Sequence, residues 1–226
     1  DRLLLAAPPP PDAPPRPGAT WLTYHLAGNL FALNRASRAA IQLTRDGTAE
    51  ILNGRLDWVY QEEVYGRDKW RAYWWRDDEC YLAFLQLDQT LVPTYRLQDH
   101  RPFRVADEDY RYPLPGDPNA RVRLGVVSPT GGPVTWVDLS RYGGADIIIC
   151  RVSWAPDGRL FFQVQDREGR WLDLNAADPV TGATHTLFRE TTPAWVNPLG
   201  EPHWLPDGSF LWRSERDGWA HLYHYD

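Results

Sequence analysis

The sequence predicts an all-β protein built from propeller blades. Runs of alternating, β-branched or aromatic residues recur between Gly, Pro, Asn and Asp, whereas amphipathic helical periodicity is nearly absent. A turn motif also repeats along the chain. A repeated turn in an all-β chain is typical of propeller blades, each a four-stranded antiparallel sheet.

The strands are expected where these runs fall. They are residues 21–26, 29–33, 40–43, 81–87, 122–127, 134–139, 147–154, 160–164, 171–174, 210–214 and 221–225. Residues 1–20 are rich in proline, which suits neither a helix interior nor a central strand, so we expect an extended loop there.

The repeated turn has the form Trp-x-Pro-Asp-Gly and stands before a strand. It occurs at Trp154–Gly158 and Trp204–Gly208, with a degenerate copy at Trp75–Glu79. Proline presets φ, and aspartate and glycine accept the bend. The spacing from the copy at Trp75 to the copy at Trp154 is wider than the next spacing, which indicates an insertion in that repeat, and we expect residues 88–121 to form an inserted hairpin or arm.

Two adjacent carboxylates stand in the aromatic segment 57–66, which is the most informative stretch for function. Asp57 is suited to begin a short helical turn and Gly66 to end it, which would place Glu62 and Glu63 about 100° apart around the helix axis. Adjacent like charges in apolar surroundings need a compensating cation. The cation is either local, from Arg67, Lys69 or Arg71, or a ligand.

Composition excludes several classes of function. The net charge is −6, from 30 acidic and 24 basic residues spread along the chain, which argues against nucleic-acid binding. No apolar run approaches the ~20 residues of a membrane span. The six histidines lack metal-ligand spacing, so neither a metal nor a cofactor is expected. Cys80 and Cys150 are interpreted as small buried side chains.

Asp57–Tyr65 resembles the Asp-Trp-Val-Tyr-x-Glu-Glu motif in the propeller domain of dipeptidyl peptidase IV and its relatives, in the prolyl oligopeptidase family of serine peptidases. Tyr112–Asn119 and Ser214–Tyr223 are similar to further segments of that domain, in the same order. The resemblance implies an eight-bladed propeller. About four of its blades would lie in residues 1–226, as part of a single domain.

The resemblance also implies a role for the acidic pair. Glu62 and Glu63 would grip the α-ammonium of a peptide substrate with a free N-terminus, so that X-Pro or X-Ala dipeptides are released. Tyr65, Asp57 and Trp58 are candidates for a neighbouring subsite. For Tyr65 the alternative is packing between blades, and the residues alone do not decide between the two.

The chain departs from the complete family pattern. It contains no Gly-x-Ser-x-Gly, so the catalytic α/β-hydrolase domain is expected elsewhere in the same parent chain, and these residues are expected to be inactive alone. Relatives dimerise through the arm, which suggests a homo-oligomer. The alternative function is a non-catalytic propeller used for binding or as a scaffold. The compartment stays open between bacterial periplasm and cytoplasm.

Overall fold

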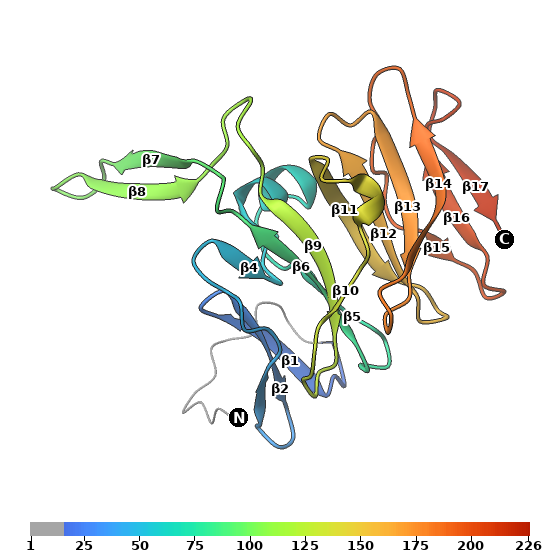
Figure 1. The fold of residues 1–226 in the computed structure, drawn as a ribbon, viewed down its shortest axis with the longest axis horizontal. Helices are drawn as coiled ribbons and strands as arrows, with labels where there is room; N and C mark the ends of the chain where they lie inside the picture. Colours follow the sequence, from blue (N-terminus) through green and yellow to red (C-terminus); the bar gives the residue numbers. More distant parts are fainter. Residues whose placement is uncertain (1–15) are drawn as a thin grey trace.

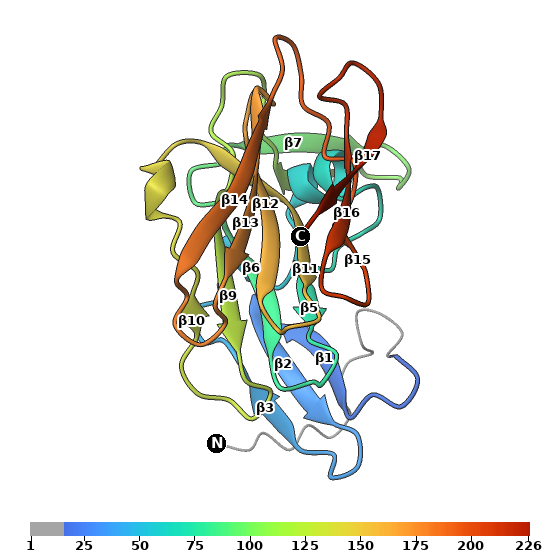
Figure 2. The same cartoon turned by 90° about the vertical axis from the view of Figure 1, so that its right-hand side faces the viewer.

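The computed structural model describes residues 16–226, and its elements are almost entirely antiparallel strands. Four sheets follow one another in chain order, from β1 (Trp21–Leu26) to β17 (His221–Tyr225) (Figure 1). Figure 2 shows the same sheets after a quarter turn. The prediction of an all-β, partial propeller is confirmed, although these sheets hold three to five strands rather than four throughout. Most of the proline-rich segment 1–20 lies outside the described residues.

The first sheet is a simple meander of β1, β2 (Asn29–Asn34) and β3 (Ala40–Gln42). Ala27 and Gly28 join its first two strands with φ values of 49° and 74°. Positive φ at both positions gives a two-residue turn that matches the right-handed twist of the strands. A Cβ at Gly28 would lie 2.4 Å from the carbonyl oxygen of Thr48, so only glycine fits there.

The second sheet has an interrupted edge strand. Its path is β10 (Thr135–Trp136), β9 (Arg121–Val127), β6 (Leu82–Asp88) and β4 (Ile51–Asn53), and β5 (Tyr73–Trp75) also pairs with β6. Asn53 is opposite Gln86 and Tyr73 is opposite Phe84, so β4 and β5 lie end to end along one edge of β6. Residues 54–72 leave the sheet between them.

A long two-stranded arm leaves the same sheet. β7 (Thr94–Asp99) pairs with β8 (Ala106–Arg111), and the two extend away from the sheets (Figure 1). The arm occurs in the chain between β6 and β9, which pair directly with each other. Residues 88–121, for which the sequence suggested an inserted hairpin, therefore contain this arm and its connections.

The third sheet has the regular four-stranded form, in the order β11 (Ile147–Trp154), β12 (Leu160–Asp166), β13 (Trp171–Ala177) and β14 (Thr184–Thr191). The fourth sheet contains β15 (His203–Trp204), β16 (Phe210–Ser214) and β17.

The repeated turn joins β5 to β6, β11 to β12 and β15 to β16, in three successive sheets. In the two Pro-Asp-Gly copies, Gly158 donates to Ala155 (2.9 Å) and Gly208 donates to Leu205 (3.1 Å), both backbone to backbone. Glu79 takes the glycine position in the degenerate copy, with φ at +55°. Its carboxylate accepts the backbone N–H of Thr20, so the residue that replaces glycine ties the second sheet to the segment before the first.

The core lies between neighbouring sheets rather than within a single centre. The largest cluster joins the second and third sheets and includes Leu85, Leu124, Val152 and Phe162, each at most 1% exposed. Smaller clusters join the first sheet to the second and the third to the fourth. Because each sheet buries apolar faces against its neighbours, the sheets hold the inner strands in fixed relative positions.

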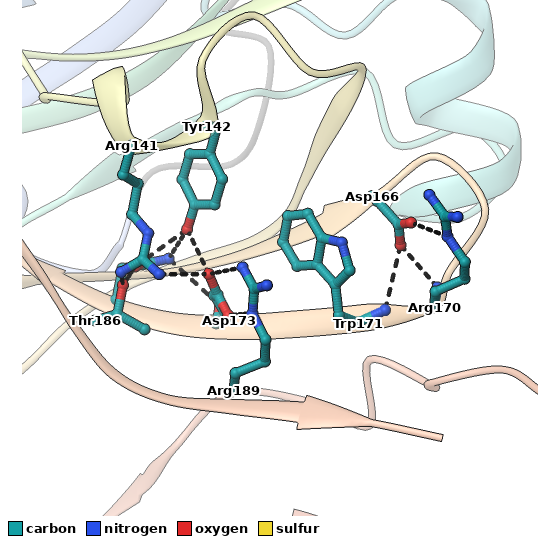
Figure 3. A network of polar contacts seen from close by, with 9 residues as sticks. Arg141, Tyr142, Asp166, Arg170, Trp171, Asp173, Thr186 and Arg189 are labelled. Carbon is teal, nitrogen blue, oxygen red and sulfur yellow. Dashed lines mark hydrogen bonds and ion pairs between the residues drawn. The ribbon is translucent and has the colours of Figure 1, made fainter. Parts of the chain in front are cut away.

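A buried polar network adds to the contact between the second and third sheets. The side chain of Asp173 on β13 is 0% exposed and receives two bonds from Arg189, at 2.6 and 2.8 Å. Arg141 and Tyr142, on the turn after β10, reach the same carboxylate at 3.6 and 3.1 Å (Figure 3). Tyr142 also stacks on Trp171. A buried charge is tolerated here because donors surround it.

Two expectations are corrected and one is refined. A short helix lies within residues 57–66 as expected, but Tyr60–Val64 is wound as a π-helix. Strand 134–139 shortens to Thr135–Trp136, because the N–H of Asp138 turns away to the carbonyl of Gly182 in the next sheet. Cys150 is buried as expected, but Cys80 is exposed, since it lies just after the turn rather than inside β6.

Candidate functional site

The acidic segment is carried on a short, hydrogen-bonded stalk. Leu56 donates its N–H to the carbonyl of Trp70 at 2.9 Å, and Ala72 donates to Gly54 at 2.9 Å. These bonds pair the outgoing and returning chains where they leave β4 and enter β5. The segment is therefore fixed at its base to the edge strand of the second sheet.

The turn itself is wound more widely than an α-helix. Asp57 begins it, because its Oδ1 accepts the N–H of Tyr60 at 2.8 Å. At the other end, Tyr65 donates its N–H to the carbonyl of Tyr60, five residues back, at 2.8 Å. Residues five apart lie about 140° from each other around an α-helix, whereas the π-turn lets both rings stack, with centroids 6.3 Å apart.

Both tyrosines dock on a β-bulge in β11. The pairing of β11 with β12 shifts between Ile149 and Arg151. Ile149 donates its N–H to the hydroxyl of Tyr60 at 3.2 Å, and its carbonyl accepts from the hydroxyl of Tyr65 at 3.2 Å. Burial raises the pKa of both tyrosines well above the ordinary value, so both hydroxyls stay protonated.

Arg151 closes the same contact from the side of the third sheet. Its Nη1 donates to the carbonyl of Val64 at 3.0 Å, and its guanidinium lies over the ring of Tyr65 at 5.7 Å. The wide turn is therefore fixed at both ends, and by two different sheets.

Glu62 and Glu63 differ in their surroundings. The side chain of Glu62 is 16% exposed, and its Oε1 accepts from Nε of Arg67 at 2.8 Å and also from Nη2. Glu63 is exposed, and within residues 16–226 its carboxylate forms no hydrogen bond or ion pair. One carboxylate of the pair is thus held by a local cation, while the other is open to a ligand.

The remaining predicted residues have internal contacts. Asp57 is 5% exposed, and burial raises the pKa of its carboxyl to about 6, although the N–H of Tyr60 opposes this. Trp58 packs edge-on against Tyr112 at the base of the arm, with ring centroids 4.4 Å apart. For Tyr65 the structure shows packing between sheets. Whether these three residues also border a substrate stays a prediction.

Sequence reasoning missed Gln61, Ile149 and Arg151. Gln61 is 4% exposed, and its Oε1 accepts the N–H of Asp68 at 3.0 Å, closing the loop that follows the turn. Its place beside the glutamates in a capped turn is a usable local signal. Ile149 and Arg151 lie more than 80 residues away, and a bulge inside an apolar strand leaves no comparable mark in the sequence.

Within residues 16–226 no group of three or more His, Cys, Asp or Glu side chains is arranged to hold a metal ion. In the same residues, no helix has the length and apolar character needed to cross a membrane.

The fold and the site together define a class of protein. The chain is a partial propeller whose edge strand opens to present two adjacent carboxylates on a rigid turn. A sequence model described as "Dipeptidyl peptidase IV (DPP IV) N-terminal region" matches residues 12–226. The chain belongs to this family, as its motifs suggested.

Relatives and a solved structure agree with this assignment. A probable dipeptidyl peptidase 4 from Aspergillus clavatus is 29% identical over 226 residues, covering 92% of this chain and 28% of that protein. A probable dipeptidyl-aminopeptidase B from Ajellomyces capsulatus is 30% identical, covering 79% of this chain and 21% of that protein. The crystal structure of Porphyromonas gingivalis dipeptidyl peptidase 4 superposes with a TM-score of 0.81 at 26% identity, covering 93% of this chain and 30% of that one. The chain thus spans less than a third of these proteins.

Proposed function

We propose that this chain anchors the free N-terminus of a peptide substrate in a serine dipeptidyl peptidase that releases X-Pro or X-Ala dipeptides. The observation that carries the proposal is the pair Glu62–Glu63 on a turn fixed by two sheets, with the Glu63 carboxylate unpaired within the described residues. Family membership supports the parent activity. The nucleophile and its acid–base partners would come from an α/β-hydrolase domain of the same parent chain.

The chemistry of an α-amino group suits this pair. Its ordinary pKa is about 8, so at neutral pH it is mostly a cation with three N–H donors. Carboxylates accept such charge-assisted bonds at short distance. Two residues of extended chain span at most about 7 Å, so holding the terminus fixes which peptide bond reaches the nucleophile.

Holding the N-terminus selects one peptide bond for cleavage only if the turn that carries the carboxylates is rigid. A carboxylate on a mobile loop would hold the ammonium at variable distances from the scissile bond. Here Tyr60, Tyr65 and Val64 are each bonded to β11. A misplacement of about 1 Å at such a site can cost a large part of the rate.

The test is hydrolysis by the full-length protein that contains this chain. We expect cleavage of a Gly-Pro-chromophore, no cleavage of its N-acetylated twin, and loss of cleavage in Glu62→Gln/Glu63→Gln. The matched control is Asp107→Asn/Glu108→Gln, an adjacent acidic pair on the arm, which should behave as wild type. Equal cleavage of both twins would indicate an endopeptidase. No cleavage by folded protein would favour the alternative, a non-catalytic binding propeller.

We further propose that the arm contacts a second copy of the protein. It carries exposed apolar side chains along both strands and at its tip: Tyr95, Leu97, Phe103, Val105 and Tyr110. Phe103 is fully exposed at the tip. A row of apolar side chains on an extended hairpin is typical of an interaction surface rather than of a solvated loop.

A further inference from the structure

The loop after the acidic turn folds Arg67 back onto Glu62. Gly66 has φ at +103° and Asp68 has φ at +66°, which reverses the chain on both sides of Arg67. The buried side chain of Gln61 then holds the N–H of Asp68 at 3.0 Å. The backbone thus places Arg67 within reach of Glu62, and the Arg67 side chain is 79% exposed.

Arg67 uses only part of the acidic pair. Its Nε and Nη2 both donate to Oε1 of Glu62. Within residues 16–226, Oε2 of Glu62 and both carboxylate oxygens of Glu63 form no hydrogen bond or ion pair. Three acceptor oxygens are left, and a primary ammonium has three donors.

The charge of the site follows the same pattern. Glu62, Glu63 and Arg67 together carry one net negative charge, and the carboxylate of Asp68 adds a further negative charge beside Arg67. Lys69 and Arg71 do not change this sum, because neither forms an ion pair with the glutamates in the described part of the chain. The guanidinium of Arg71 lies instead over the ring of Tyr73, at 5.6 Å.

We propose that Arg67 sets the valence of the cation that the pair accepts. By occupying one oxygen and neutralising one charge, it leaves a site matched to a primary ammonium and unsuited to a divalent metal ion, which prefers several oxygens and more negative charge. Arg67 is then a specificity-determining residue of the proposed ammonium site, and the inference rests on the proposed function.

The test uses the full-length protein and calcium as the probe. Arg67→Gln should gain calcium binding, measured by calorimetry without substrate, whereas wild type and Arg67→Lys should bind none. The control Arg55→Gln removes the same charge from an arginine that lies over Trp70 instead of near a carboxylate, and it should also bind none. The double variant Arg67→Gln/Glu62→Gln should lose the gained site.

Kinetics give the second readout. With a dissociation constant of about 1 mM, as in extracellular calcium sites, about 5 mM calcium would raise the apparent KM of Arg67→Gln about sixfold while kcat stays unchanged. Absence of calcium binding by Arg67→Gln would overturn the inference, even if the free-amine substrate is cleaved as proposed. Calcium binding by that variant in a protein that cleaves nothing would support the role of Arg67 and reject the proposed function.

Discussion

Tyr65 donates its hydroxyl to the carbonyl of Ile149, 84 positions further along the chain and 3.2 Å away. Tyr60 accepts the N–H of the same residue. The two polar groups that a bulge exposes on β11 are therefore satisfied by the turn that carries Glu62 and Glu63. The bulge and the acidic turn therefore supply hydrogen-bond partners to each other.

Replacing Tyr65 by Phe should loosen the turn without unfolding the sheets. The variant keeps the ring stack but leaves the buried carbonyl of Ile149 without this donor, a loss of about 1–3 kcal/mol. We expect faster amide exchange in residues 58–66, measured by hydrogen–deuterium exchange on the full-length protein, with unchanged exchange in β12 and β13.

The control for this change is Tyr110→Phe. That hydroxyl contacts Glu108 on the exposed arm and should leave the turn unaffected. If Tyr65→Phe also leaves exchange in residues 58–66 unchanged, the hydroxyl does not fix the turn.

Asp57 should make the turn less stable as pH rises. Burial raises the pKa of its carboxyl from 3.8 to about 6, so between these values the folded state keeps a proton that the unfolded state has lost. The free energy of unfolding therefore falls from about pH 4 to about pH 6, by about 3 kcal/mol in total.

Asp57→Asn removes this charge and keeps an acceptor for the N–H of Tyr60. The difference in melting temperature between the variant and wild type should grow from pH 4 to pH 6 and then level off. A constant difference over that range would show that Asp57 does not titrate with folding.

The parts of the fold that the sequence predicted depend on local signals. Alternation marked β1, β11 and β16, and the Pro-Asp-Gly turns marked where two of the sheets begin. β14 was missed, because its run Thr184–Thr191 is mostly polar and only partly buried. β4 and β5 were missed as one edge strand, because the interruption between them removes any continuous period.

The candidate site divides in the same way, into features with a local sequence signal and features that depend on distant residues. The motif placed Glu62 and Glu63 on a capped turn, and named Arg67 among three local cations. It did not predict the π-turn, which depends on Tyr60 and Tyr65 reaching a strand of the next sheet. Such partners are set by tertiary packing, and a single sequence carries no record of them.

The Asp173 network should contribute far more stability than a surface ion pair of similar geometry. Asp173→Asn weakens its contacts with Arg189, Arg141 and Tyr142 at a fully buried side chain, and we expect a loss of about 1–3 kcal/mol. Arg96→Gln, which breaks a two-bond contact with Asp109 on the exposed arm, should cost much less. Denaturant unfolding of the full-length variants measures both, and equal losses would contradict the assigned role of burial.

Shortening the arm should change assembly and leave the acidic turn intact. Residues 94–111 can be replaced by a short Gly-Ser link, because Tyr112 donates its N–H to the carbonyl of Pro93 at 3.0 Å and so closes the arm at its base. Tyr112 must be kept, since it packs against Trp58 at the start of the turn.

If the arm contacts a second copy, sedimentation should show a dimer for the full-length protein and a monomer for the shortened one, with KM for a free-amine dipeptide substrate unchanged. The substitution Phe103→Ser at the fully exposed tip should weaken the dimer in the same direction. A shortened protein that remains dimeric would place the interface elsewhere.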